Sequence, residues 1–331
     1  MVRATLHEQE IRQAIGVPGE GDAVVDGLAS LDEPHDRYLY WCNERGAVTA
    51  RESLAPRMGC IVIAPNGSGL VGELGDSRIL EVPDPRAALA KVLAQIEALG
   101  RQPAWVDERY ISPRARISPH AVVEGEVTIG DGVEIEPFCT VGPDVSIGRG
   151  SVLRAGVRVY PRVSIGEESF VGTNSVIGLE GSGHVRDEAG NTTRIPHLGG
   201  VVIGSHVEIG ALAGVESGAI TPTTIEDHAT VGGMTAVAHG ARVERGATIA
   251  GGVVLAGSSV VGAEAWVGIN STVREGRRIG SRALVGMDVS VQEDLPDDAI
   301  ARAPRPDVAK RPPDDDRAAI GFASRTARRP S

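Results

Sequence analysis

The sequence predicts a mainly β protein in which a parallel β-helix follows a small α/β domain. The first observation is a six-residue repeat from Ile111 to about Val291, each unit opening with Ile, Val or Leu and often continuing with Gly. The second is that residues 1–104 lack this repeat and carry strand and helix patterns. The third is a tail from residue 297 that is rich in Pro and charge. We therefore expect three parts, 1–104, 105–296 and 297–331, the last extended or disordered.

A period of six fits neither an α-helix nor an alternating strand. It suits a coil with three flat sides, in which each six-residue unit forms one side and eighteen residues complete a turn. The aliphatic residue then points inward and stacks on its equivalent one coil away. The small residue beside it allows the corner where the chain bends, and backbone hydrogen bonds join coils about 4.8 Å apart. Representative units are IGDGVE, VGPDVS, IAGGVV and LAGSSV.

Residues 1–104 carry the patterns of two strands and a helix. GCIVIAP (59–65) and RILEV (78–82) are apolar runs typical of buried strands. PDPRAALAKVLAQIEAL (83–99) starts with Pro and continues with strong helix formers, which predicts a helix. This alternation indicates a small α/β domain.

The repeat is interrupted twice. Residues 178–200 (GLEGSGHVRDEAGNTTRIPHLGG) form a long insertion, which predicts a loop thrown out of one corner. A four-residue slip follows at AITPTT (219–224). Long loops on a rigid scaffold commonly carry function, so we expect the 178–200 loop to border the site.

The composition argues against several classes of function. The formal net charge of −11 and an aromatic content of 3% argue against nucleic-acid binding. No apolar run approaches a membrane span, and the N-terminus lacks a signal-peptide pattern. Three cysteines form no motif, so we expect a cytoplasmic protein. Lysine occurs only at Lys91 and Lys310, which leaves Arg and backbone N–H groups to hold anionic ligands.

His239 differs from the other histidines in its position. It follows the inward-facing Val237 by two residues, which places it near a corner and facing outward. Gly257 comes eighteen residues later, one coil further on. A histidine beside a glycine with an accessible N–H is a plausible general base and oxyanion donor for acyl transfer.

The hexapeptide repeat and several longer stretches resemble a known family. GSGHVRDEAGNTTRIPHLGGVVIGSHVEIGALAGVESGAI, TAVAHGARV and ATIAGGVVLAGSSVVG are similar to UDP-3-O-acylglucosamine N-acyltransferases, as are DGLASL and VPDPRAALAKVLAQI in the first domain. The resemblance to hexapeptide-repeat proteins implies a left-handed β-helix, the exception to the right-handed crossover rule. It also implies a homotrimer with active sites between subunits.

The resemblance assigns residue roles as well. By motif, His239 matches the histidine of the family's "IAHN" sequence, which takes a proton from a sugar amine as the amine attacks an acyl-carrier-protein thioester. The loop at 178–200 would border a nucleotide-sugar pocket, and Asn43 matches a uridine-binding asparagine. The resemblance implies no bound cofactor and no metal, with acyl-carrier-protein or acyl-CoA thioester as co-substrate.

The chain departs from the family pattern in the acceptor pocket. Gly240 replaces the Asn after the histidine, and Gly232 replaces an Asp that often orients it. A further family histidine falls at Gly276, with Glu275 beside it. Loop aromatics are replaced by Ser182 and by Thr192 or Thr193. The candidate acceptor-binding residues are Asn43, Ser182, His184, His197 and Glu275.

A group of arginines lies late in the repeat. One interpretation is docking of an acidic carrier protein or of coenzyme A phosphates, for which Arg is suited. The other is a solvated edge that offsets neighbouring acids. The residues are Arg274, Arg277, Arg278 and Arg282, with Arg242 and Arg245 one or two coils earlier.

The leading hypothesis is therefore an N-acyltransferase acting on an amino sugar, nucleotide-linked, with His239 as general base. A sugar acetyltransferase that uses acetyl-CoA and a non-catalytic nucleotide-sugar binder are the alternatives. A zinc carbonic anhydrase would need three converging histidines, which the spacing does not provide. A sugar-nucleotide pyrophosphorylase would need a Gly-rich phosphate loop at its start, which EIRQAIGVPGEGDAV does not form.

Overall fold

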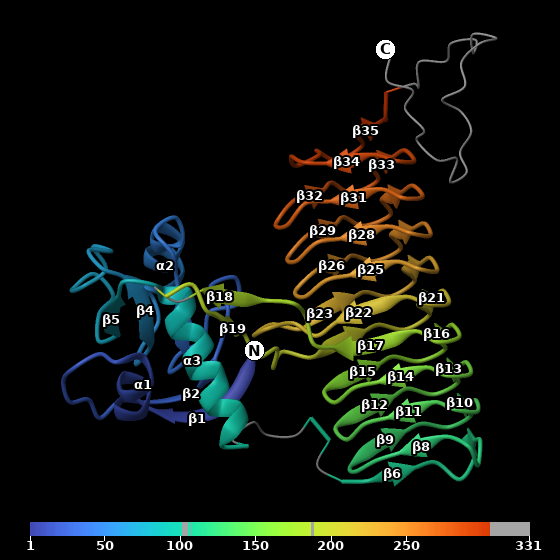
Figure 1. Ribbon diagram of the computed structural model, residues 1–331, viewed down its shortest axis with the longest axis horizontal. Helices are drawn as coiled ribbons and strands as arrows, with labels where there is room; N and C mark the ends of the chain where they lie inside the picture. The colour runs from blue at the N-terminus through green and yellow to red at the C-terminus, as the bar shows by residue number, and fades with distance from the viewer. Residues whose placement is uncertain (101–104, 107, 187–188, 305–331) are drawn as a thin grey trace, which may run out of the picture.

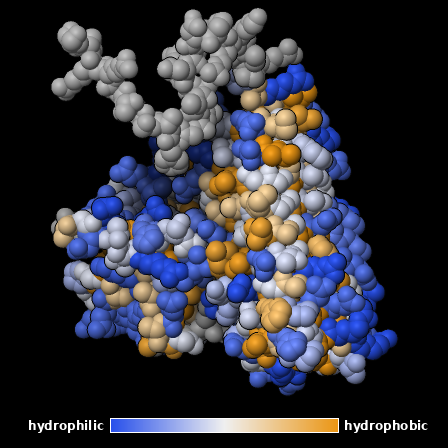
Figure 2. All heavy atoms as spheres, turned by 45° about the vertical axis from the view of Figure 1, so that its right-hand side comes forward, coloured by the Kyte–Doolittle hydropathy of each residue, from blue (hydrophilic) through white to orange (hydrophobic). Residues whose placement is uncertain are grey.

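The computed structural model describes residues 1–100, 105–106, 108–186 and 189–304. It consists of an α/β domain beside a tall three-sided solenoid (Figure 1). The predicted class, mainly β with a small N-terminal α/β domain, is confirmed. Figure 2 shows a mainly hydrophilic surface on the N-terminal domain, whereas apolar side chains lie among polar ones on the solenoid.

The N-terminal domain is one five-stranded sheet with three helices. Its strand order is β1-β2-β3-β4-β5, in which only the β1–β2 pair is antiparallel. The predicted strands and helix are confirmed as β4, β5 and α3. The strands are β1 (Val2–His7), β2 (Val24–Leu28), β3 (Leu39–Trp41), β4 (Ile61–Pro65) and β5 (Arg78–Val82), and the helices are α1 (Glu8–Ile15), α2 (Gly46–Leu54) and α3 (Pro85–Ala98).

Helix α3 begins where the sequence indicated. The Asp84 carboxylate accepts hydrogen bonds from the backbone N–H groups of Arg86 and Ala87, and Pro85 occupies the first helical position. This cap stabilises the start of the helix, and it fixes the place of Arg86 at the helix N-terminus.

The solenoid is built of three parallel sheets, one for each side of the prism. The first runs β7 (Arg116–Ile117), β10 (Glu134–Ile135), β13 (Val152–Leu153), β16 (Phe170–Val171), β21 (Glu208–Ile209), β24 (Thr230–Val231), β27 (Thr248–Ile249), β30 (Trp266–Val267), β33 (Leu284–Val285) and β35 (Ile300–Ala301). The second runs β8 (Val122–Val123), β11 (Thr140–Val141), β14 (Arg158–Val159), β17 (Val176–Leu179), β22 (Gly214–Glu216), β25 (Ala236–Val237), β28 (Val254–Leu255), β31 (Thr272–Val273) and β34 (Ser290–Val291). The third runs β6 (Tyr110–Ile111), β9 (Val127–Ile129), β12 (Val145–Ile147), β15 (Val163–Ile165), β20 (Val201–Ile203), β23 (Thr223–Ile225), β26 (Arg242–Val243), β29 (Val260–Val261) and β32 (Arg278–Ile279).

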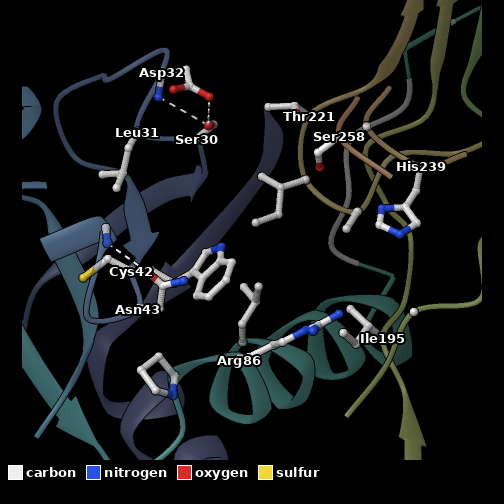
Figure 3. Close-up of a pocket in the computed structure, with 18 of the residues that line it drawn as sticks. Ser30, Leu31, Asp32, Cys42, Asn43, Arg86, Ile195, Thr221, His239 and Ser258 are labelled. Atoms are coloured by element: carbon white, nitrogen blue, oxygen red, sulfur yellow. Dashed lines mark hydrogen bonds between the residues drawn. The ribbon is translucent and has the colours of Figure 1, made fainter. Parts of the chain in front are cut away.

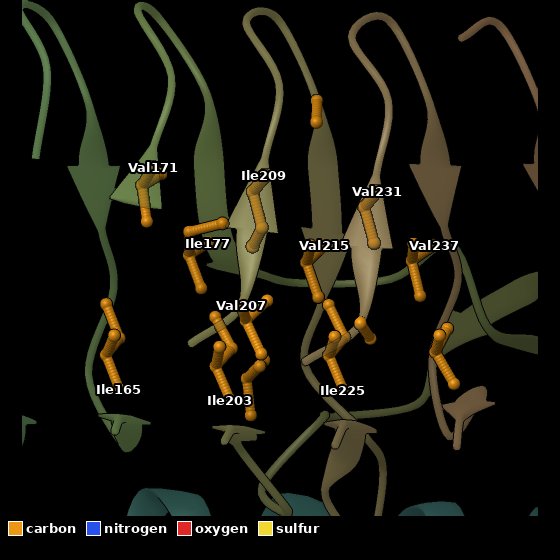
Figure 4. Close-up of a cluster of buried hydrophobic side chains, with 14 of the residues drawn as sticks. Ile165, Val171, Ile177, Ile203, Val207, Ile209, Val215, Ile225, Val231 and Val237 are labelled. Carbon is orange, nitrogen blue, oxygen red and sulfur yellow. The ribbon is translucent and has the colours of Figure 1, made fainter. Parts of the chain in front are cut away.

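The aliphatic residue that opens each unit points into the prism. Ile177, Val215 and Val237 form one such column, because their strands pair in parallel register. These side chains are fully buried and stack along the axis, as Figure 4 shows. Burying each of them stabilises the fold by roughly 1.5–3 kcal/mol.

The glycine after the aliphatic residue has a different role from the predicted one. Gly148 and Gly166 lie outside the left-handed region, so the corner does not depend on their conformational freedom. A Cβ on Gly166 would lie 2.5 Å from the carbonyl carbon of Gly204 in the next coil. Left-handed backbone occurs two residues after this glycine, for example at Glu168. Glycine is therefore required because adjacent coils approach closely.

The predicted loop at 178–200 connects the two parts of the molecule. It contains a two-stranded antiparallel hairpin, β18 (His184–Arg186) with β19 (Thr192–Arg194). Ile195 and Leu198 from the loop, together with Ile220 from the four-residue slip, are buried in the core of the N-terminal domain. The loop thus fixes the N-terminal domain beside the solenoid and creates the cleft described next.

The chain after residue 296 begins as part of the solenoid. Ile300 and Ala301 form β35, which pairs in parallel with β33. Most of the predicted extended or disordered tail, residues 305–331, lies outside the described residues.

Candidate active site

A cleft of about 620 Å³ lies between the N-terminal domain and the solenoid. Figure 3 shows side chains from β3, α3, the 178–200 loop and the solenoid corners converging on it. Its walls include Trp41, Asn43, Arg86, Ile195, His197, Thr221, His239, Gly240, Ser258 and Glu275.

His239 lies at a corner of the solenoid, directly over Gly257. Val237 pairs with Leu255 in parallel strands, so His239 and Gly257 occupy equivalent places in consecutive coils. A Cβ on Gly257 would lie 2.6 Å from His239 Cε1 and 2.8 Å from Nε2. The imidazole therefore rests on the glycine, and only glycine leaves room for it.

The backbone N–H of Gly257 has no acceptor among the described residues. One coil below, the His239 N–H donates to Oε2 of Glu216 at 3.0 Å. By register, Ala238 occupies the place of Glu216 in the next coil. An alanine has no acceptor, and within the described part of the chain the Gly257 N–H donates to no other group. An unused donor beside the imidazole suits the stabilisation of an oxyanion.

Glu216 is a site residue that the sequence analysis did not identify. Its carboxylate is half-buried beside His239. The family often carries an orienting Asp at the position of Gly232, but in this structure Gly232 does not lie beside His239. A Cβ on Gly232 would meet the backbone of Ala250 and Gly251, at another corner. Counting in units of six missed Glu216, because the four-residue slip lengthens the spacing between Glu216 and the equivalent position in the next coil.

His197 is buried against His239. Its side chain is 2% exposed, and its ring centroid lies 5.1 Å from that of His239 in an edge-to-face arrangement. Burial, and to a lesser extent the neighbouring His239, lowers the pKa of His197 from 6.5 to about 4. His197 is therefore neutral at physiological pH.

The far end of the cleft is formed by the N-terminal domain. Trp41 contributes an aromatic surface, which the sequence analysis missed. Asn43 lies beside it, with its side-chain oxygen accepting the Gly46 N–H at 2.8 Å. Arg86 extends from the start of α3 into the cleft (Figure 3). An aromatic ring, an amide and a guanidinium are groups that bind a base and phosphates.

The structure brings some of the predicted acceptor residues together and leaves others apart. Asn43, His197 and Glu275 line the cleft with His239. Ser182 and His184 are exposed outside its walls, where His184 Nδ1 lies 2.7 Å from the Ser182 carbonyl oxygen. A contact of these two residues with the acceptor stays a prediction.

Most of the predicted arginine group is engaged in ion pairs on the surface and none of it lines the cleft. The pairs are Arg242–Glu226, Arg245–Asp227, Arg277–Asp294, Arg278–Glu244 and Arg282–Asp298. Exposed pairs of this kind offset charge and contribute little stability. Arg274 has no ion pair among the described residues.

The described residues offer neither a metal-binding cluster nor a membrane-spanning helix. Among the described residues, no group of three or more His, Cys, Asp or Glu side chains is arranged to hold a metal ion. No helix in the same part of the chain has the length and apolar character needed to cross a membrane.

Models of hexapeptide-repeat families match parts of the solenoid. Residues 126–161 match "Bacterial transferase hexapeptide (six repeats)". Residues 162–181 and 222–256 match "Hexapeptide repeat of succinyl-transferase".

Individual proteins give longer matches. A UDP-3-O-acylglucosamine N-acyltransferase of Coxiella burnetii is 30% identical over 247 residues, covering 71% of this chain and 69% of that protein. A protein of the same name from Francisella tularensis is 43% identical over 72 residues, 22% of this chain and 21% of that protein. A solved UDP-N-acetylglucosamine acyltransferase from Campylobacter jejuni superposes with a TM-score of 0.50 at 26% identity, covering 54% of this chain and 68% of that chain. The predicted left-handed parallel β-helix is thereby confirmed.

Proposed function

Because this chain belongs to the UDP-3-O-acylglucosamine N-acyltransferase family and is an acyltransferase, we propose that it acylates the amine of a nucleotide-linked amino sugar. The acyl group would come from an acyl-carrier-protein or acyl-CoA thioester. The observation that carries the proposal is the pairing of His239, which lines the cleft, with the unused N–H of Gly257. We place the reaction in the cytoplasm.

Each group has one role in the proposed reaction. His239 accepts a proton from the sugar amine as the amine nitrogen attacks the thioester carbonyl carbon. The C–N bond forms, and the negative charge on the carbonyl oxygen is stabilised by the Gly257 N–H. When the tetrahedral intermediate collapses, the C–S bond breaks and the proton on His239 passes to the departing thiolate. The products are an amide and a free thiol.

The acceptor would occupy the full length of the cleft. Trp41 and Asn43 would hold the base at the far end, while Arg86 would pair with the pyrophosphate. Arg86 is the only arginine or lysine in the described lining, so an anionic group has one obvious place to bind. Glu275, one coil beyond Gly257, would accept hydrogen bonds from sugar hydroxyls. In this scheme residues 1–104 bind the acceptor and residues 105–296 carry out catalysis.

The donor and the assembly are also proposed. Arg274, which has no acidic partner in the described part of the chain, is our candidate for docking a carrier protein or coenzyme A. Four further arginines would contribute to docking only if they leave their present ion pairs; these are Arg242, Arg277, Arg278 and Arg282. A homotrimer with active sites between subunits would have three times the 34.4 kDa mass of the chain, which light scattering measures.

The test is intact-mass analysis of reactions that pair a panel of nucleotide amino sugars with acyl-carrier-protein and CoA thioesters. A product that gains one acyl group, and is lost in His239→Ala, would establish the reaction and identify both substrates. Product only from acetyl-CoA would favour a sugar acetyltransferase. Binding of a nucleotide sugar without product from any donor would favour a non-catalytic binder and overturn the proposal.

A further inference from the structure

His197 and Glu216 contact the proposed base from the side opposite Gly257. The Glu216 carboxylate accepts the His239 backbone N–H, and the His197 ring packs against the His239 ring. A Cβ on Gly181 would lie 2.7 Å from Glu216 Oε2 and 2.9 Å from His197 Nε2. The carboxylate and the imidazole edge of His197 are thus close neighbours, and both depend on glycine at 181.

Although His197 lines the cleft, its burial leaves little of its surface to contact substrate. It is 2% exposed, and its Nδ1 has no hydrogen-bond partner among the described residues. Burying a polar ring without satisfying both nitrogens costs free energy. Such a residue commonly serves a neighbouring functional group, and the group in contact here is His239.

The charges in this cluster match the needs of a base that becomes protonated. A protonated His197 would repel the imidazolium that forms on His239. Its burial keeps it neutral, so this repulsion is absent. Glu216 lies on the same side and accepts the His239 backbone N–H at 3.0 Å.

We propose that Glu216 and His197 form a positioning pair for His239 that holds its ring over Gly257 during acyl transfer. This inference rests on the proposed function, because it assumes that His239 is the base. The family often carries an orienting Asp where this chain has Gly232, which has no carboxylate. The pair would perform that orienting task instead.

The test compares His197→Ala, His197→Gln and Glu216→Gln with the wild type in the full chain. The matched control is His120→Ala, which removes an exposed histidine that does not line the cleft. We expect His197→Ala and Glu216→Gln to lower kcat by about 10- to 100-fold with both KM values within twofold, because a displaced base impairs chemistry without impairing binding. His197→Gln retains an uncharged polar side chain that still fills much of the space beside His239, so it should recover part of kcat.

The outcomes separate this inference from the proposed function. Wild-type kcat in His197→Ala, or a loss confined to KM, would overturn the positioning role. If His239→Ala retains activity, the proposed function fails as well. If His239→Ala is inactive and His197→Ala and Glu216→Gln are normal, only the positioning pair is wrong. Should His197→Ala fail to fold, the kcat and KM of His197→Gln and Glu216→Gln decide the question.

Discussion

Replacing Gly257 by Ala adds one methyl group at the most crowded point of the proposed site. The new Cβ would lie 2.6 Å from His239 Cε1, whereas carbon atoms pack at about 3.5–4.0 Å. The imidazole must therefore move by roughly 1 Å, and a misplacement of that size lowers turnover by about 100-fold. Gly257 lies outside the left-handed region, so alanine introduces no backbone strain.

The assay is the steady-state rate of thiol release from the thioester donor, together with the thermal midpoint of unfolding. The matched control is Gly214→Ala in the same column of strands, where the nearest atom to the new Cβ is 4.0 Å away. We expect kcat to fall about 100-fold in Gly257→Ala with an unchanged midpoint, and the control to behave as wild type. Wild-type kcat in Gly257→Ala would refute the placement of the base.

Further predictions concern the N–H donor, the buried histidine and the coil contacts. Ala238→Glu should abolish turnover while preserving acceptor binding measured by calorimetry, because the new carboxylate would engage the Gly257 N–H as Glu216 engages that of His239. The pKa of His197 falls from 6.5 to about 4 on folding, so the unfolded chain binds the extra proton and stability declines as pH falls from about 6.5 to 4. Between pH 7 and 4.5, the free energy of unfolding measured in urea should fall by about 2–3 kcal/mol more in the wild type than in His197→Gln. Equal decreases in the two proteins would contradict this prediction. Gly166→Ala should lower stability by about 1–3 kcal/mol in urea, since its Cβ would lie 2.5 Å from the Gly204 carbonyl carbon, and an unchanged midpoint would disprove that crowding.

The sequence predicted the solenoid well because the six-residue period reflects contacts between neighbouring coils only. An aliphatic residue that is in phase with the repeat points into the prism. Counting in units of six therefore predicts that Val237 faces inward and that His239 lies near a corner. The same counting placed Gly257 one coil beyond His239, and the parallel register confirms it. Strand β4 followed from a local apolar run, and helix α3 from the proline at its start.

The parts that counting could not predict depend on insertions and on contacts between distant segments. Glu216 lies before a four-residue slip, which moves it out of phase with His239. His197 approaches the base only because Ile195 and Leu198 anchor its loop in the N-terminal core. Trp41 and Arg86 reach the cleft through the placement of one domain against the other, which no local pattern specifies.

The most direct test of the central claim is the single-turnover rate of acyl transfer by His239→Ala, measured with saturating acceptor and donor. If His239 is the general base on the Gly257 N–H, the rate constant falls by about 10²- to 10⁴-fold while the thermal midpoint and acceptor affinity stay at wild-type values. A rate constant within a fewfold of wild type would contradict the account.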